Sequence, residues 1–377
     1  FVYCLRKYGI YTNLNLLTGR TYTEKDGMPS GTDKIPDWKN RHLIGFWNDK
    51  ARNLQKDYAK TLLEHVNPYT GLALKDDPAL IIIEINNEQG MIHSYLGNGL
   101  NNCPDVLWDE LEIKWNERLK NHNLDKSVLE KKYNETHKNG KILVDSNSRW
   151  NLEQHEGAKA SFSDNGSTKI IDIKKNGTQS WHVQFNTPKL QIDEEKVYTV
   201  SFKAKASKKC DFNLSVMMAN DQWTGLGFNK KVTLDTKWNE YTIILAGLKS
   251  DSNARLNIGE LGFLSGTKIE FQNLKMSEGG NIVAVKTSKN GIEFPRPEVY
   301  SELPEGYKNL VLNFLYDVEK DYWTDMRDFI REELSCSALL MGSAMGNVTT
   351  GISCLFDIID SHAYFNHPVF PGNDWDM

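Results

Sequence analysis

The chain has 377 residues, of which 39% are hydrophobic and 25% are charged, a composition typical of a globular protein with two or three domains. Its formal net charge of −5 argues against a nucleic-acid partner, because phosphate binding needs a concentrated basic surface. No apolar run approaches the length of a membrane span, and the five cysteines form no close pair with metal-ligand spacing, so neither a membrane protein nor a disulfide scaffold is expected.

The first part of the chain alternates between helix and strand signals. Residues 1–9 have the pattern of a helix end stopped by Gly9, and residues 10–17 predict a buried strand. A loop rich in Gly, Pro, Asp and Lys follows to about residue 44. It carries Arg20, for which two interpretations stay open: a salt bridge under the loop, or a role in shaping a substrate cleft. Apolar residues spaced by three and four then predict an amphipathic helix over residues 48–66.

Residues 76–90 contain the strongest strand signal. A β-branched run follows Pro78 and changes abruptly to amides and a carboxylate, which predicts a parallel strand of an α/β sheet, buried on both faces. Catalytic groups collect at the carboxyl ends of such strands, so Asn87 and Glu88 are candidates. The alternative is that Glu88 only caps the next segment and is solvated. Glu84 lies four residues before Glu88, on the same face of the strand but deeper in the sheet. This position predicts an interior carboxylate with a partner.

After Glu88 the pattern first continues and then changes. Helices are predicted over residues 106–121 and 126–137. From Lys141 onward, short period-two strands are divided by Asn, Gly, Asp and Lys, which indicates an antiparallel β-sandwich without helices. The predicted strands cover residues 158–163, 169–173, 181–185, 198–205, 213–217, 240–246, 254–258 and 268–274.

The helix and strand alternation returns beyond Met276. An amphipathic helix is predicted over residues 305–334, followed by short strands over 337–341 and 354–359. His362 and Tyr364 follow the last of these strands and, being two residues apart, are expected on the same face. The sandwich is therefore predicted to be an insertion in an α/β domain.

The Asn-Glu pair that closes the strand in residues 76–90 resembles strand four of the clan A glycoside hydrolases, which are retaining (β/α)8-barrel enzymes. In that clan the Glu is the acid/base and the preceding Asn holds the hydroxyl next to the scissile bond, so the resemblance gives these roles to Glu88 and Asn87. It also implies substrate contacts by His362 and Tyr364, with Arg20 and Trp375 as further substrate-binding candidates. It implies no cofactor.

The resemblance covers only part of a barrel. The four predicted parallel strands outside the sandwich match strands three to six, and the clan's nucleophile, a Glu at the end of strand seven, has no counterpart before Met377. Leu17-Thr18 also stands where many relatives have a His at the end of strand three. The expected fold is a partial (β/α)8 TIM barrel, an open half-barrel whose isolated activity is nil or very low.

Residues 141–277 resemble the jelly-roll carbohydrate-binding modules of families four and nine. The resemblance is carried by the stretch from Val197 to Ala206, by Trp238-Asn239-Glu240-Tyr241-Thr242, and by the closing stretch from Gly266 to Phe271. The resemblance also implies that such a sandwich can hold a structural calcium ion, although no dense carboxylate cluster marks its ligands. Exposed indoles and amides are the candidate sugar contacts: Trp181, Gln184, Asn220, Gln222 and Trp223.

The predicted domains are a barrel part over residues 1–140, the sandwich over 141–277 and a continuation of the barrel over 278–377. The predicted function is retaining hydrolysis of O-glycosidic bonds, β by preference, in a poly- or oligosaccharide. The alternative is a non-catalytic carbohydrate-binding protein in which the barrel part is scaffold, and in either case the sandwich can instead be a spacer. No nucleic acid, membrane or metal site is expected, and the expected location is extracellular or on the cell surface.

Overall fold

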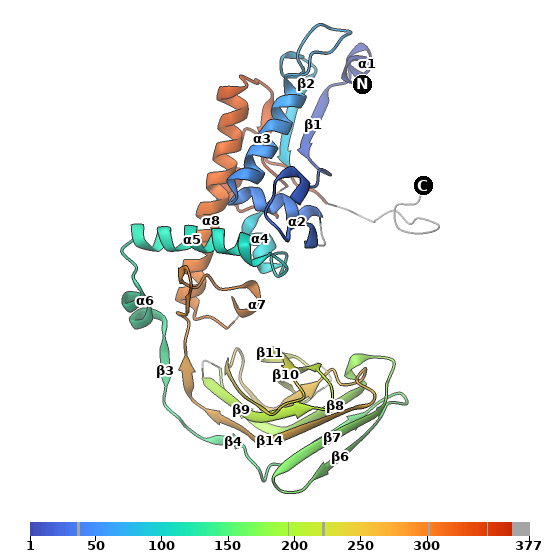
Figure 1. The fold of residues 1–377 in the computed structure, drawn as a ribbon, viewed down its shortest axis with the longest axis vertical. Coiled ribbons are helices and arrows are strands. Elements are labelled where there is room, and N and C mark those ends of the chain that lie inside the picture. The colour runs from blue at the N-terminus through green and yellow to red at the C-terminus, as the bar shows by residue number, and fades with distance from the viewer. Residues whose placement is uncertain (36–37, 195, 221–222, 301, 345, 364–377) are drawn as a thin grey trace. The chain divides into compact units, whose positions relative to one another are not determined.

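The computed structural model describes residues 1–35, 38–194, 196–220, 223–300, 302–344 and 346–363. Contacts divide the chain into two compact units (Figure 1). One unit contains the described residues of 1–132 and 285–377, and the other contains those of 133–284. The second unit extends beyond the predicted 141–277 at both ends, because β3 (Glu135–His137) pairs with β15 (Gly280–Ile282).

The first unit is built on a parallel sheet in the order β1-β2-β18. These strands are β1 (Thr12–Leu17), β2 (Leu80–Asn86) and β18 (Leu339–Met341), and Asn15, Glu84 and Met341 lie in one row across them. The other elements of this unit are α1 (Val2–Lys7), α2 (Trp38–Leu43), α3 (Asp49–Leu63), α4 (Met91–Leu96), α5 (Asp105–Asn121), α6 (Lys126–Tyr133), β16 (Thr287–Ser288), β17 (Gly291–Ile292), α7 (Pro297–Tyr300), α8 (Glu305–Asp328) and α9 (Thr350–Ser353).

Helix α3 shows how the sequence produces this packing. The side chain of Asn48 caps its first turn by accepting from the backbone N–H of Ala51 at 2.8 Å. Its buried positions recur every four residues, which turns one face toward the core, and the residues directly beside that face form ion pairs with α8. Arg52 pairs with Asp321 at 3.0 Å and Lys56 with Asp325 at 2.7 Å, so α3 and α8 lie side by side (Figure 1).

Two predicted elements of this unit are wrong. Residues 354–359 do not form a strand: α9 ends at Ser353 and turns follow, with Asp360 forming only an isolated parallel bridge to Ala344. This segment is held against β18 by Asp357, whose backbone N–H donates to the carbonyl of Leu340 and whose carboxylate accepts from the backbone N–H of Leu340. Residues 354–359, five of them apolar, were too short a segment to separate a strand from a turn. The helix predicted over residues 126–137 ends at Tyr133, and its last residues form β3 instead.

The second unit is a β-sandwich of two antiparallel sheets (Figure 1). The five-stranded sheet has the order β11-β10-β13-β8-β5, and the six-stranded sheet has the order β12-β9-β14-β7-β6 with β4 paired to β14. The strands are β4 (Ile142–Val144), β5 (Asn151–Gln154), β6 (Lys159–Asp164), β7 (Thr168–Lys175), β8 (Val183–Ile192), β9 (Val197–Ala206), β10 (Cys210–Met218), β11 (Gly225–Leu234), β12 (Asn239–Ala246), β13 (Asp251–Gly259) and β14 (Thr267–Glu278).

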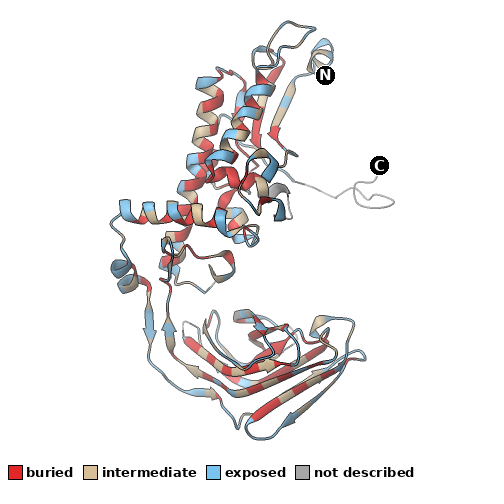
Figure 2. Cartoon of the chain, in the orientation of Figure 1, coloured by how far each residue is buried: buried red, intermediate tan, exposed pale blue. Residues whose placement is uncertain are grey.

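The sandwich core follows the period-two pattern of the sequence. Buried and accessible residues alternate along β9 and β14, as Figure 2 shows. Phe185 is fully buried between the sheets and stacks on Trp150 with ring centroids 4.6 Å apart. The predicted antiparallel sandwich is confirmed. β4, β5 and β11 were not predicted, and Trp181, predicted to begin a strand, lies in a single helical turn just before β8.

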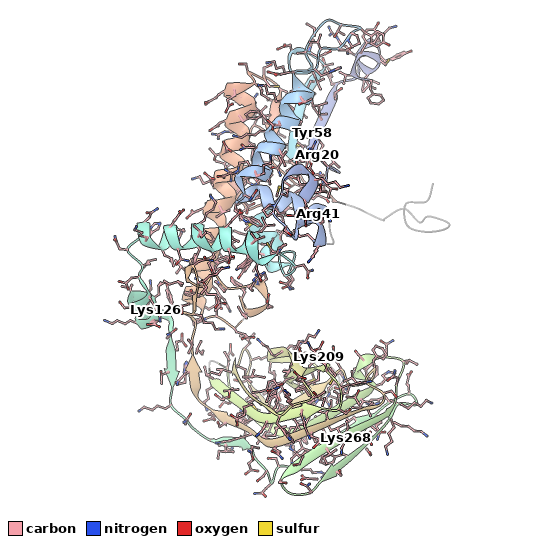
Figure 3. The ribbon with its side chains drawn as sticks, viewed as in Figure 1. Arg20, Arg41, Tyr58, Lys126, Lys209 and Lys268 are labelled. Carbon is pink, nitrogen blue, oxygen red and sulfur yellow. The ribbon has the colours of Figure 1, made fainter. Side chains whose placement is uncertain are left out.

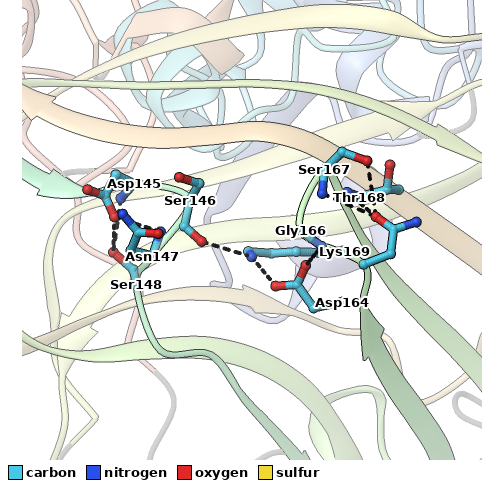
Figure 4. A network of polar contacts seen from close by, with 10 residues as sticks. Asp145, Ser146, Asn147, Ser148, Asp164, Gly166, Ser167, Thr168 and Lys169 are labelled. Carbon is cyan, nitrogen blue, oxygen red and sulfur yellow. Dashed lines mark hydrogen bonds and ion pairs between the residues drawn. The ribbon is translucent and has the colours of Figure 1, made fainter.

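A buried lysine closes one edge of the sandwich (Figure 4). Lys169 is 7% exposed, forms an ion pair with Asp164 at the end of β6, and donates to the backbone carbonyl of Ser146 at 3.4 Å. The hydrogen bond from Lys169 is the main reason why the pKa of Asp164 lies below its ordinary value. The ammonium group therefore ties the segment before β5 to the end of β6.

Candidate functional site

The carboxyl ends of the three parallel strands form the first candidate site. Pairing continues past the end of β2, because the backbone N–H of Asn86 donates to Gly342 at 3.1 Å and that of Asn87 donates to Leu17 at 3.0 Å. Asn87 and Glu88 therefore lie at the rim of the sheet, where the sequence predicted them.

The backbone at Glu88 has an unusual conformation. Its φ is 51°, in the left-handed region that residues with a Cβ adopt rarely. Two neighbours hold the turn: the N–H of Gln89 donates to Ser343 Oγ at 2.9 Å, and a Cβ added at Gly90 would lie 1.7 Å from the carbonyl oxygen of Asn347. Strained backbone that its surroundings hold in place is common at functional sites.

The structure brings Glu88 together with His362. His362 Nδ1 lies 3.0 Å from Glu88 Oε1, and His362 Nε2 lies 3.0 Å from Asp360 Oδ2. The hydrogen bond to Glu88 is the largest cause that raises the pKa of His362 above its ordinary value. With a proton on each ring nitrogen, the imidazolium donates to both carboxylates at once. All three side chains are partly accessible, at 23% for Glu88, 29% for His362 and 32% for Asp360.

This contact predicts a change in the titration of His362. In Glu88→Gln the pKa of His362 is expected to fall, because a neutral amide replaces the carboxylate that stabilises the imidazolium. NMR of the histidine ring protons between about pH 5 and pH 9 measures the midpoint, with His362→Gln to assign the signal. Glu117→Gln, on the exposed face of α5, is the control. An unchanged midpoint in Glu88→Gln would contradict the contact.

Two further amides and a buried carboxylate lie beneath this pair. Glu84 is 4% exposed and accepts a hydrogen bond from Asn15 Nδ2, which also donates to Asn87 Oδ1 at 3.3 Å. Burial raises the pKa of Glu84 to about 7. Glu84 is thus an interior carboxylate, as predicted, and its hydrogen-bond partner is an amide.

Arg20 has a different environment. Its guanidinium lies 3.7 Å from Asp26 and packs over the rings of Tyr22 and Tyr58 at 5.3 and 5.5 Å (Figure 3). These contacts agree with the salt bridge under the loop, and the role in shaping a cleft stays a prediction. Tyr364 and Trp375 lie outside the described residues.

The outer face of the five-stranded sheet forms the second candidate site. Its core-facing residues alternate with polar ones, and the strand register aligns five polar side chains across all five strands. In the order of the strands they are Asn229, Ser215, Asn257, Asn186 and Asn151. We call this set the polar row. Its three central members are at most 3% exposed, so neighbouring side chains cover most of their surface.

A charged network lies beside the polar row. Arg255 donates to Glu153 at 3.0 Å and to Gln184 at 3.1 Å, while Asn257 donates to the same oxygen of Gln184 at 3.0 Å. The guanidinium of Arg255 packs on the indole of Trp223 at 4.4 Å. Trp223 has a left-handed φ of 47° and is 50% exposed, so the network holds one side of an indole whose remaining surface is accessible.

The structure separates the five predicted sandwich residues. Gln184 and Trp223 belong to the charged network, but Trp181 packs against His182 and His155 near the start of β8. Asn220 donates to the sulfur of Met218 at 3.7 Å, and Gln222 lies outside the described residues. Sequence reasoning missed Glu153, Asn186, Arg255 and Asn257. The available signal was the alternation Ala254-Arg255-Leu256-Asn257-Ile258, which places two polar side chains on the face of a strand that points away from the apolar core.

The described residues show neither a metal centre nor a membrane span. No three His, Cys, Asp or Glu side chains among them come together as ligands, so the structural calcium stays a prediction. None of the helices in the described ranges is both long enough and apolar enough to cross a bilayer.

Comparisons with known proteins match the sandwich. The family model described as "Carbohydrate binding domain" (CBM_4_9) matches residues 134–259. A solved structure described as "CBM4 structure and function" is 25% identical, with 37% of this chain and 94% of that chain covered and a TM-score of 0.31. The N-terminal cellulose-binding domain of β-1,4-glucanase C from Cellulomonas fimi is 11% identical, with 34% and 86% covered and a TM-score of 0.28.

A search of curated proteins found no match. The family match covers the polar row and the charged network, and it leaves the unit with the parallel sheet unassigned. The comparisons thus identify residues 134–259 as a carbohydrate-binding domain of the CBM4/9 type.

Proposed function

We propose that this chain binds a polysaccharide or oligosaccharide on the outer face of the five-stranded sheet. The observation that carries the proposal is the polar row, flanked by the half-exposed indole of Trp223, within the region that matches the carbohydrate-binding family. Sugar hydroxyls both donate and accept hydrogen bonds, and side-chain amides do the same. An indole offers the apolar face on which a sugar ring stacks.

The side chains of this face are preorganised, because they contact one another in the absence of a ligand. Arg255 fixes Trp223 from one side, and Gln184 accepts from both Arg255 and Asn257. Binding therefore orders few side chains, which lowers its entropic cost. The other face of the sandwich, on the six-stranded sheet, carries cross-strand charge pairs such as Lys205 with Glu270 at 3.6 Å.

The location of binding is tested by NMR on the full chain. Adding a soluble oligosaccharide is expected to shift the side-chain amide signals of Asn186 and Asn257, which lie in the polar row. Gln272, on the six-stranded sheet, is the control and should not shift. Shifts confined to Gln272 and its neighbours would contradict the proposed face.

The other unit favours a second activity, retaining hydrolysis of an O-glycosidic bond. The supporting observation is the 3.0 Å contact of Glu88 with His362 at the carboxyl end of β2. In this proposal Glu88 is the acid/base: it protonates the departing oxygen and later removes a proton from the attacking water. Asn87 holds the neighbouring hydroxyl.

Hydrolysis with retention of the anomeric configuration needs a second carboxyl group roughly 5 to 5.5 Å from the first. Glu84 and Asp360 are carboxylates close to Glu88 among the described residues, but Glu84 is buried under Asn15 and Asp360 lies behind the imidazole of His362. In keeping with the sequence prediction, the proposal assigns the nucleophile to neither of them and expects a separate residue to supply it.

The alternative is that the α/β unit is only a scaffold for the carbohydrate-binding domain. An aryl β-glycoside assay of Glu88→Gln beside the wild type, in a version extended beyond Met377, separates the two, since equal rates favour the scaffold. The match to a carbohydrate-binding family also supports an extracellular or cell-surface location, because domains of this type are typical of secreted proteins.

A further inference from the structure

The side chain of Asn15 connects two parts of the α/β site that the glycosidase proposal treats separately. Asn15 lies on β1 directly beside Glu84 on β2 in the parallel register. Its Nδ2 donates one hydrogen bond to Glu84 Oε2 and a second to Asn87 Oδ1 at 3.3 Å. A primary amide has two N–H groups on this nitrogen, so both donors are engaged.

The buried carboxylate of Glu84 fixes the orientation of the Asn15 side chain. It is 4% exposed, and the charged or titratable groups around it are His362, Asp360 and Glu88. Rotating Asn15 away would leave a buried carboxylate without its amide donor, and buried polar groups without partners are costly. The amide plane of Asn15 is therefore fixed by the more buried of its two partners.

The consequence for Asn87 is a defined orientation. Its backbone N–H is held by Leu17 at 3.0 Å, and its side-chain oxygen is occupied by Asn15. The Nδ2 group has no protein partner in the described part of the chain. Asn87 is thus set to act as a hydrogen-bond donor at the rim.

We propose that Asn15 is a positioning residue, which holds Asn87 so that its NH2 group donates to an oxygen of the substrate. The inference rests on the glycosidase proposal and refines it: the site selects a sugar with a hydrogen-bond acceptor, such as a hydroxyl oxygen, next to the scissile bond. Asn15 itself does not touch the substrate.

The test does not need a substrate. In the full chain labelled with ¹⁵N-asparagine, Asn15→Ala is expected to shift the side-chain amide signal of Asn87, which Asn87→Ala identifies. Asn13→Ala, at an exposed position two residues earlier on β1, is the matched control and should leave that signal unchanged. An Asn87 signal that is the same in Asn15→Ala and in the wild type would overturn the proposal.

The role of Glu84 is tested by following the side-chain amide signal of Asn15 during a pH titration. The Asn15 signal is expected to move with a midpoint near 7 as Glu84 loses its proton, and this movement should vanish in Glu84→Gln, which keeps an acceptor oxygen. An Asn15 signal that titrates identically in Glu84→Gln would overturn the anchoring by Glu84.

A rate measurement then separates this inference from the glycosidase proposal. If the chain hydrolyses an aryl β-glycoside, Asn15→Ala and Asn87→Ala should lower the rate by similar factors, and the double variant should be no slower than Asn87→Ala. Additive losses would contradict positioning. Shifted Asn87 signals, together with equal rates for wild type and Glu88→Gln in a version that hydrolyses the substrate, would uphold the contact and contradict the acid/base role of Glu88.

Discussion

Replacing Glu88 with glutamine is expected to lower the hydrolysis of an unactivated β-glycoside by about 100-fold to 10,000-fold, the range that general acid–base catalysis contributes. The amide has nearly the shape of the carboxyl group but cannot deliver a proton to the departing oxygen. The loss should be smaller for a dinitrophenyl glycoside, because its leaving group is a weak base and needs little protonation. This dependence on the leaving group distinguishes a lost acid from a damaged fold.

The assay compares wild type, Glu88→Gln and the surface control Glu117→Gln, in this chain and in a version extended beyond Met377. The extended version is included because neither of the described carboxylates close to Glu88, Glu84 and Asp360, is assigned as the nucleophile. Wild type and Glu117→Gln should have equal rates. Equal rates for wild type and Glu88→Gln in an active version would contradict the acid/base role.

Replacing Trp223 with alanine is expected to weaken polysaccharide binding by about tenfold or more, the cost typical of truncating an aromatic anchor. The variant removes the exposed indole surface and also the partner on which the Arg255 guanidinium packs at 4.4 Å. Calorimetry on the full chain with a soluble polysaccharide measures the affinity.

The chain offers a closely matched control for this variant. Trp238 is also partly exposed and also carries a cation over its ring, Lys205 at 5.0 Å, but it directly precedes β12 in the six-stranded sheet. Trp238→Ala should leave the affinity within twofold of wild type. A larger loss in Trp238→Ala than in Trp223→Ala would place the binding surface on the other side of the sandwich.

Much of the fold could be predicted from the spacing of apolar residues along the sequence. The apolar run before Asn87 predicted β2 and its polar end, because a β-branched run of this kind is typical of a parallel strand. The predicted burial on both faces holds only for the second half of β2, since Ile81 is exposed and Ile82 is partly buried. The alternation in residues 198–205 likewise predicted β9. Periodicity failed where the segment was short: the residues after α9 and those of β3 are set by their tertiary neighbours, Leu340 and β15.

The candidate sites were harder to predict, because they depend on contacts far apart in sequence. Glu88 was found from its strand, but its pairing with His362 joins segments 274 residues apart. Arg255 was missed for the same reason, since its partner Glu153 lies 102 residues earlier. Gln184 was predicted as a sugar-binding amide, but the structure gives it a second role as the acceptor that orders Arg255 and Asn257.

Affinity electrophoresis of the full chain tests the central claim most directly. Soluble glucans, mannans and xylans are cast separately into native gels, and the migration of the chain is compared with a gel that contains no polysaccharide. Carbohydrate binding predicts retardation in at least one gel, which free oligosaccharide of the same composition should relieve. Unchanged migration in every gel would contradict it and would leave the sandwich as a spacer.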